Sequence, residues 1–325
     1  MGYGCIPTLG SEFTAANVGG VTTVVAGCGI KGNDSSWGAA IAAAMAADAI
    51  VLTLGSDRSV AEEGGDLGSI AIPGMQSAFA QAVLAAAGPS KPVTLVLVSS
   101  FPLSFEELIP SLSAVVLAYN PGFGASAVAA ALFGANRWGR SVFTHYPKAY
   151  TAAVALNDFS MVPSASNPGR TYRYYTGSVG PASITVGQGL SYSALAVACS
   201  GSGSGSGVLT LACNVSCTAG PPGDQVLQVF HRAGPDVVAR VAGAHPIPRL
   251  TMHGVQRLAL GGEGASASVL FSLPEGATLG LVNGTGARVL YAGSHYLDVW
   301  DGSANNVTLT FTVAQDSAVS VPPTP

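Results

Sequence analysis

A run of three carboxylates follows an apolar segment in a chain that carries few charges. Residues 61–66 read Ala-Glu-Glu-Gly-Gly-Asp, while only 9% of the 325 residues are charged. Acidic residues among glycines usually form a solvated loop. Two carboxylates that flank a substrate can instead hydrolyse a glycosidic bond, one as acid/base and one as nucleophile or base. Glu62, Glu63 and Asp66 are too close in sequence for spacing to assign these roles, so both interpretations stand at this point.

Other patterns that could support chemistry are weaker. Gly27-x-Gly29-x-x-Gly32 has the spacing of a dinucleotide-binding turn, but Asn33 to Ser36 look like the N-cap of a helix that starts too late for that fold. The histidines are scattered and the five cysteines lack the paired spacing of a zinc site, so we expect no metal. The odd number of cysteines leaves one thiol free. No Gly-x-Ser-x-Gly motif indicates a serine hydrolase.

The composition argues against several classes of protein. The net charge of −4 gives no basic surface, so we expect no nucleic-acid partner. The most apolar window, residues 39–55, is interrupted by Asp48 and reads as a helix followed by a buried strand rather than a membrane span. Residues 1–10 lack the basic start and apolar core of a signal peptide. Asn-x-Ser/Thr triplets, which favour a secreted parent protein, begin at Asn33, Asn214, Asn283 and Asn306.

The first half of the chain alternates apolar strands with alanine-rich helices. We expect strands at 20–28, 49–55, 92–100 and 113–119, and helices at 36–47, 73–87 and 124–133. This alternation is typical of a mostly parallel sheet with helices on both faces. Ligands bind such sheets beyond the carboxyl ends of the strands. The loops 56–69, 99–105 and 120–125 should therefore leave one edge of the sheet, which makes the acidic loop a plausible site.

The second half changes character at about residue 186. Short β-rich runs separated by Gly, Pro, Asn and Asp predict an antiparallel β-sandwich, with runs at 208–215, 225–231, 237–242, 255–260, 267–273, 279–283, 295–300 and 306–313. The Ser-Gly repeat at 200–207 is either a flexible linker or a hairpin tip. Residues 150–185, with their Arg and Tyr side chains, should pack as a connector across the seam. The predicted domains are 1–185 and 186–325.

Several long stretches resemble one known family. Residues 54–74 (LGSDRSVAEEGGDLGSIAIPG), 156–177 (LNDFSMVPSASNPGRTYRYYTG) and 253–273 (HGVQRLALGGEGASASVLFSL) are similar to the C-terminal region of family 3 glycoside hydrolases. The branch is that of the plant- and fungal-type β-xylosidases and α-arabinofuranosidases. The resemblance covers nearly the whole chain. It implies an α/β three-layer sandwich with a mostly parallel sheet, followed by an all-β fibronectin type III-like sandwich.

The resemblance also implies a reaction and its residues. The reaction is retaining hydrolysis of β-linked xylosides or similar pentosides, without a metal or an organic cofactor. The acidic loop of the family reads Glu-Ala-Glu-Gly-x-Asp-Arg, and its second Glu, the acid/base, falls on Glu63. Glu62 is the alternative if the position has shifted. Asp57 and Asp66 are the expected substrate-binding carboxylates.

The chain departs from the family in ways that bear on activity. Ala61 and Leu67 stand where the pattern has its first Glu and its Arg, so charges that would orient the loop are lost. The nucleophilic Asp of the family comes from an N-terminal (β/α)8 barrel, which needs about 250 residues. We therefore expect no nucleophile in this chain, a barrel as its partner, and no activity of the chain alone.

Two further expectations concern location and ligands. The resemblance implies an extracellular or cell-wall protein that meets xylo- or arabino-oligosaccharides. The competing hypothesis is a non-catalytic module that binds polysaccharide or docks a partner through an exposed apolar face.

Overall fold

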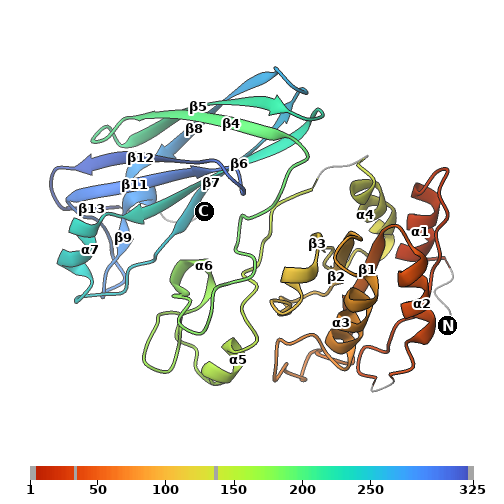
Figure 1. Cartoon of the computed structure of the whole chain (residues 1–325). Coiled ribbons are helices and arrows are strands. Elements are labelled where there is room, and N and C mark those ends of the chain that lie inside the picture. The colour runs from red at the N-terminus through yellow and green to blue at the C-terminus, as the bar shows by residue number, and fades with distance from the viewer. Residues whose placement is uncertain (1–4, 33–34, 135–137, 321–325) are drawn as a thin grey trace.

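The first half of the chain is built on a three-stranded parallel sheet. The computed structural model describes residues 5–32, 35–134 and 138–320 (Figure 1). The strands β1 (Ile50–Gly55), β2 (Val93–Val98) and β3 (Ala114–Leu117) pair in the order β1-β2-β3. They are short runs rich in Val, Leu and Ile, as expected for parallel strands that are buried on both faces.

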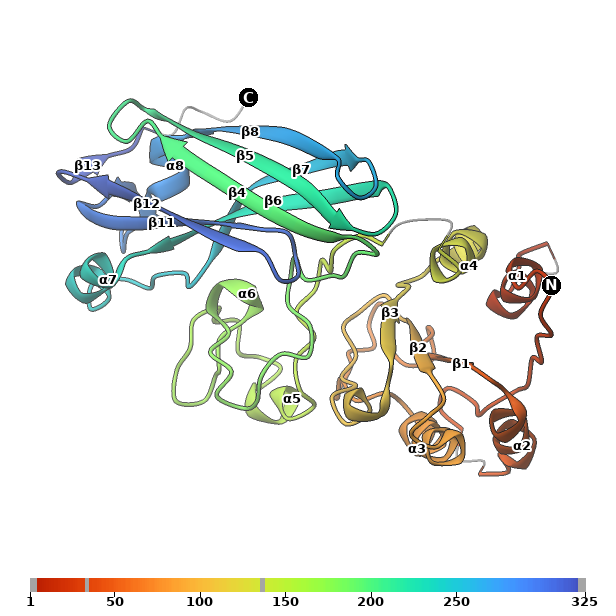
Figure 2. The same cartoon turned by 45° about the horizontal axis from the view of Figure 1, so that its top comes forward.

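Helices cover both faces of this sheet (Figure 2). The helices α2 (Gly38–Ala46) and α3 (Gln76–Ala87) pack on the face that carries Leu95 and Leu97 of β2. The helices α1 (Leu9–Ala16) and α4 (Ala125–Leu132) pack on the face that carries Val96. The alternating side chains of β2 thus enter two separate apolar cores. Two short 3-10 helices, Ile109–Ser111 and Gly122–Gly124, lie in the loops.

One predicted strand of this half is wrong. Residues 20–28 form no ladder, and Val21 and Val24 are 93% and 66% exposed. A Cβ on Gly27 would lie 2.6 Å from the Phe79 ring of α3, so the segment packs along a helix rather than beside a strand edge. A β-branched run becomes a strand only where a neighbouring backbone completes its hydrogen bonds. The other strands and helices predicted for this half are present with ends shifted by a few residues, whereas α1 was not predicted.

The second half consists of antiparallel sheets. Two larger sheets have the orders β12-β11-β6-β7 and β4-β5-β8, and a small one has the order β13-β10-β9. Leu211, Leu227 and Leu297, which come from both larger sheets, are fully buried in one apolar core. The strands are β4 (Ala194–Ser202), β5 (Val208–Ala219), β6 (Gly223–Ala233), β7 (Thr251–Leu260), β8 (Ser266–Pro274), β9 (Leu281–Val282), β10 (Arg288–Leu290), β11 (Gly293–Trp300), β12 (Asn306–Val313) and β13 (Ser317–Ala318).

The run predicted as a strand at 237–242 is instead a helix. It lies in α7 (Pro235–Val241), where Pro235 occupies the first turn. Val237 and Val241 are both buried, because residues four apart share one helical face. A proline-led helical start therefore outweighs the β propensity of the valines.

The Ser-Gly repeat is a hairpin tip rather than a linker. Residues 203–207 connect β4 to β5, and the carboxylate of buried Glu275, in the helix α8 (Glu275–Leu279), accepts hydrogen bonds from the N–H groups of Gly205 (2.8 Å) and Gly207 (3.1 Å). The predicted run at 279–283 shortens to β9 because α8 extends to Leu279.

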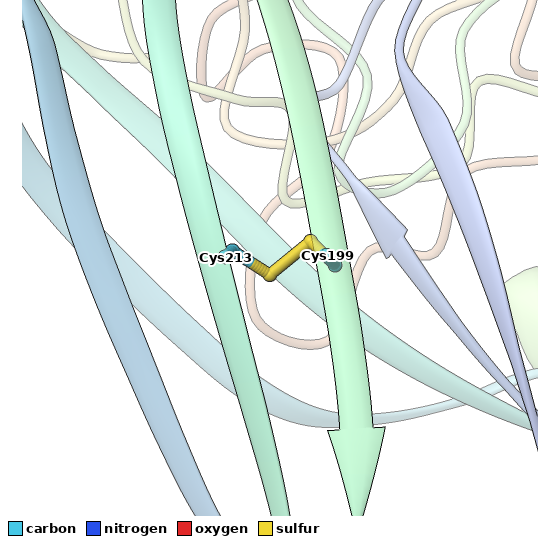
Figure 3. The surroundings of a disulfide bond; sticks show 2 residues. All are labelled: Cys199 and Cys213. Atoms are coloured by element: carbon cyan, nitrogen blue, oxygen red, sulfur yellow. A yellow bond between two sulfur atoms is a disulfide. The ribbon is translucent and has the colours of Figure 1, made fainter.

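A disulfide joins the same two strands. Cys199 of β4 and Cys213 of β5 stand opposite each other in the ladder and are bonded (Figure 3). Cys5, Cys28 and Cys217 are free thiols, so the chain has three free cysteines rather than the one that parity requires.

The connector is ordered around a group of tyrosines. It contains the short helices α5 (Tyr150–Ala153) and α6 (Thr171–Tyr174). The rings of Tyr146 and Tyr150 stack with centroids 4.0 Å apart, and Tyr175 packs edge-on against both.

Hydrogen bonds to residues 187–189 tie the two halves together. The side-chain amide of Gln228 in β6 donates to the carbonyl of Gly187 at 2.8 Å, and the N–H of Gly189 donates to the carbonyl of Gly302 at 2.9 Å. On the other side, Ser141 exchanges backbone hydrogen bonds with Gly187 (2.7 Å) and Gln188 (2.8 Å). Residues 187–189 are therefore held from both halves of the molecule.

Candidate active site

The acidic loop leaves the carboxyl edge of the parallel sheet, as predicted. Because β1, β2 and β3 are parallel, the loops that follow them start at the same edge (Figure 1). The hydroxyl of Ser56, just after β1, donates to the hydroxyl of Ser99, just after β2, at 2.8 Å. At its far end, the loop accepts a 2.7 Å hydrogen bond on the carbonyl of Ile70 from the N–H of Ser104. The loop is thus fixed at both ends to its neighbour.

Glu63 lies at the tip of a tight turn within this loop. Glu62 and Gly65 exchange backbone hydrogen bonds of 3.2 and 2.9 Å, which leaves Glu63 and Gly64 as the two central residues. Gly64 has a φ of +78°, the conformation that the third residue of a type II turn requires. The turn therefore places Glu63 at the tip of the acidic loop.

The adjacent carboxylates have different surroundings. The carboxylate of Glu62 pairs with Arg58 at 3.2 Å, with side chains 52% and 92% exposed, so this pair contributes about 0–1 kcal/mol. Glu63 and Asp66 are exposed, and neither makes a hydrogen bond or ion pair with the part of the chain that the structure describes. Of the two adjacent Glu residues, only Glu63 has a free carboxylate.

Asp57 is engaged in the local structure of the loop. Its carboxylate accepts hydrogen bonds from the hydroxyl of Ser59 at 2.6 Å and from the N–H of Ser59 at 2.9 Å. These hydrogen bonds, with a smaller contribution from the charge of Lys31, lower the pKa of Asp57. The Lys31 ammonium also donates to the carbonyl of Ser59. Asp57 therefore stabilises the start of the loop, while its predicted substrate contact stays a prediction.

A small cavity lies at the carboxyl ends of β2 and β3. Its volume is about 10 Å³, room for one water molecule, and its lining comprises Leu97, Ser99, Phe101, Leu117, Tyr119 and His145. Nδ1 of buried His145 donates to the carbonyl of Leu103 at 3.1 Å, whereas Nε2 has no hydrogen-bond partner among the described residues. Burial lowers the pKa of His145. The cavity is too small to hold a ligand larger than water.

Two residues that position the loop were not singled out from the sequence. One is Arg58, whose i,i+4 spacing to Glu62 is a signal only in a helix. The other is buried Gln76, whose side-chain amide accepts from the N–H of Gly55 and donates to its carbonyl, each at 2.8 Å. Gln76 thereby fixes the end of β1 to the first turn of α3. Its place after Pro73 and Gly74 at a helix start is the only sequence signal for this role.

The glycine pattern of a dinucleotide site does not have the matching fold. Gly32 donates to the carbonyl of Gly29 at 3.2 Å in a turn, and α2 begins only at Gly38. Asn33 and Asp34 lie outside the described residues. Within the described ranges, no helix is both long and apolar enough to cross a membrane, and no group of three His, Cys, Asp or Glu side chains is placed to hold a metal ion.

Comparison with known proteins identifies the family of this chain. Residues 6–192 match the glycosyl hydrolase family 3 C-terminal domain. The chain belongs to this family. Beta-D-xylosidase 1 of Arabidopsis thaliana is 40% identical over 172 residues, which cover 52% of this chain and 21% of that protein. Exo-1,4-beta-xylosidase xlnD of Aspergillus niger is 33% identical over 197 residues, which cover 59% of this chain and 24% of that protein.

Solved structures of family 3 enzymes share the fold of both halves. A GH3 exo-beta-xylosidase (XlnD) in complex with a xylobiose aziridine activity-based probe superimposes with a TM-score of 0.79 at 22% identity, covering 96% of this chain and 42% of that one. The GH3 beta-glucosidase of Bifidobacterium adolescentis gives a TM-score of 0.78 at 20% identity, covering 98% of this chain and 46% of that one. The family 3 chain described here thus spans less than half the length of each of these relatives.

Proposed function

We propose that this chain is the C-terminal portion of a retaining β-xylosidase-like glycoside hydrolase, in which Glu63 is the acid/base. The observation that carries the proposal is the turn at 62–65, which presents a free Glu63 carboxylate at the carboxyl edge of the sheet. Glu62, the alternative, is turned toward Arg58 by their ion pair. The similarity to Beta-D-xylosidase 1 and xlnD supports β-linked xylosides as the substrate class.

In the proposed reaction Glu63 acts twice. As an acid it protonates the glycosidic oxygen while a nucleophilic carboxylate attacks the anomeric carbon, and as a base it then deprotonates the water that releases the sugar. An acid that works near neutral pH must keep its proton there, and burial beside the substrate favours the protonated form. The exposed Glu63 side chain would acquire that burial when a partner domain covers the sheet edge.

The nucleophile is proposed to come from that partner. In a retaining glycosidase the two carboxyl groups lie about 5–5.5 Å apart across the sugar. We propose a (β/α)8 barrel as the partner domain, with its Asp facing Glu63. Asp57 and Asp66 flank the turn and are the proposed contacts to sugar hydroxyls. Without the barrel, the chain has an acid/base but no attacking group assigned to it.

The remaining parts of the chain have proposed roles too. We propose domains at 1–185, a three-layer α/β sandwich, and at 186–325, a fibronectin type III-like sandwich. The disulfide Cys199–Cys213 supports an extracellular location, because disulfides persist in oxidising compartments.

A fusion enzyme tests the proposed role of Glu63. The full chain is joined behind the N-terminal part of Beta-D-xylosidase 1 that precedes the matched segment, and hydrolysis of xylobiose is measured. Glu63→Gln should lower kcat by about 10²–10⁴-fold, the usual contribution of general acid–base catalysis. The loss should be smaller on an aryl xyloside with a good leaving group, which needs no protonation.

Glu62→Gln is the matched control and should leave most of the activity. A larger loss in Glu62→Gln than in Glu63→Gln would refute the assignment. The unfused chain should not turn over either substrate. Calorimetry of the unfused chain with xylohexaose addresses the competing hypothesis, since tight binding in Glu63→Gln and in the parent chain alike would favour a non-catalytic binding module.

A further inference from the structure

One of the Asn-x-Ser/Thr triplets forms a turn of its own. Residues 283–285 (Asn-Gly-Thr) follow β9 and lead into β10, whereas Asn214 lies within β5 and Asn306 begins β12. The triplet at Asn33 begins outside the described residues. Such triplets accept N-linked oligosaccharides in secreted proteins, where they occupy surface loops. Among the described triplets, the one at 283–285 therefore has the local structure of an acceptor.

The carbonyl end of the Asn283 side chain is engaged within this turn. Its Oδ1 accepts hydrogen bonds from the hydroxyl of Thr285 at 2.8 Å, from the N–H of Thr285 at 3.0 Å and from the N–H of Ala287 at 2.9 Å. Because a backbone N–H can only donate, these contacts identify the engaged atom as the oxygen. The other end of the amide is therefore Nδ2, the atom to which an N-linked sugar is attached.

Nδ2 of Asn283 is open to solvent. It donates to no atom of the described chain, and it is not buried. Strand β9 is the terminal strand of the small sheet β13-β10-β9, so among the described strands only β10 lies beside it in that sheet. At the other end of the turn, a Cβ on Gly286 would meet no atom within 4 Å. These surroundings leave room for a bulky group on Nδ2.

The turn depends on contacts between near neighbours in the sequence. Besides the bonds to Oδ1, the N–H of Asn283 donates to the carbonyl of Ala287 at 2.8 Å, and the N–H of Gly286 donates to the carbonyl of Asn283 at 3.0 Å. Asn side chains form such turns locally. The backbones of Asn214 and Asn306 are instead placed by pairing with distant strands. The turn can therefore form in a chain that has only just entered the secretory compartment, before those strands pair.

We propose that Asn283 carries an N-linked oligosaccharide. In the transfer, Nδ2 forms a bond to the anomeric carbon of an oligosaccharide held on a lipid pyrophosphate, and the bond between that carbon and the phosphate oxygen breaks. Nδ2 gives up a proton, and the lipid pyrophosphate leaves with the electron pair of the broken bond, so nothing is oxidised or reduced. The proposal rests on the extracellular location proposed above and is independent of the role of Glu63.

Translation of the full chain in the presence of endoplasmic reticulum microsomes tests the proposal. A leader peptide directs the chain into the lumen, and only chains that the membrane protects from added protease are scored, so every molecule analysed has met the transferase. Peptide mass spectrometry before and after enzymatic removal of N-glycans measures the occupancy of each triplet. Asn283 should be occupied to a greater extent than Asn214 or Asn306.

Thr285 offers a matched pair of variants. Thr285→Ser keeps the hydroxyl and should keep the glycan on Asn283, whereas Thr285→Ala removes the hydroxyl and should abolish the glycan. Asn283→Gln should likewise lose it completely. Asn214→Gln, which removes a triplet within β5, should leave the occupancy of Asn283 unchanged.

A bare Asn283 in the protected chains would overturn the proposal, as would an occupancy equal to or lower than that of Asn214 or Asn306. The turn belongs to the β-rich half, whereas the acidic loop belongs to the first half (Figure 1). Asn283→Gln should therefore leave hydrolysis by the fusion enzyme unchanged. Since occupancy is measured without any hydrolysis, failure of this site and failure of the proposed activity are told apart.

Discussion

Substitution of Gly64 should loosen the turn that presents Glu63. With a φ of +78° Gly64 adopts a backbone conformation that costs an L-residue about 1–2 kcal/mol. A Cβ at this position would meet no atom within 4 Å, so Gly64→Ala adds no clash and the backbone cost is the whole effect. The closed turn should therefore become about 5- to 30-fold less populated relative to open forms.

Backbone amide exchange measures this population directly. The N–H of Gly65 donates to the carbonyl of Glu62 at 2.9 Å, so its exchange rate should rise by the same factor in Gly64→Ala. Gly65→Ala is the matched control, because it adds the same methyl group at a position with ordinary contacts of 3.7–3.9 Å and no positive φ. If both variants accelerate exchange equally, the positive φ of Gly64 is not what holds the turn.

Three other predictions concern the stability of the β-rich half. Reduction of the Cys199–Cys213 disulfide, which closes a loop with a sequence separation of 14, should lower the free energy of unfolding by about 3 kcal/mol in denaturant titrations. Cys217→Ala keeps this disulfide and should show the same loss on reduction, whereas Cys199→Ala should show none. Gln225→Leu should raise the free energy of unfolding by about 1–2 kcal/mol, because the side-chain N and O of Gln225 are buried without a hydrogen-bond partner among the described residues. A lower melting temperature of the variant would argue against this. Burial and nearby arginine charges lower the pKa of His253 to about 4 in the folded chain, so the unfolded state binds more protons below about pH 6.5. The free energy of unfolding should therefore fall by about 3 kcal/mol as the pH drops to about 4. The variant His253→Gln should reduce this dependence of stability on pH.

Much of the first half could be predicted from local pattern. The apolar runs at β1 and β2 are bounded by Gly and Pro, and the alanine-rich segment of α3 ends at Gly88, so periodicity and breakers define them well. Residues 20–28 have the same β-branched composition yet form no strand. The two segments differ in their neighbours. Strand β2 pairs with a strand on each side, whereas the backbone at Gly27 packs against the ring of Phe79. Such a choice depends on tertiary contacts, which a local pattern does not contain.

The location of the candidate site could be predicted from the sequence, but the arrangement of its side chains could not. Parallel strands oblige the acidic loop to leave the same edge as its neighbours, and the structure confirms this. The distinction between Glu62 and Glu63 depends on a turn and on the ion pair with Arg58, both of which need coordinates.

The hydrogen bonds to residues 187–189 from both sides couple the two halves of the molecule. Gln228 holds Gly187 from the β-rich half, and Gly187 in turn holds Ser141, which lies four residues before His145 and its hydrogen bond to Leu103. A short series of hydrogen bonds thus links the β-rich half to the carboxyl edge of the parallel sheet. The C-terminal half is thus bonded to an edge whose strands all come from the first half of the chain.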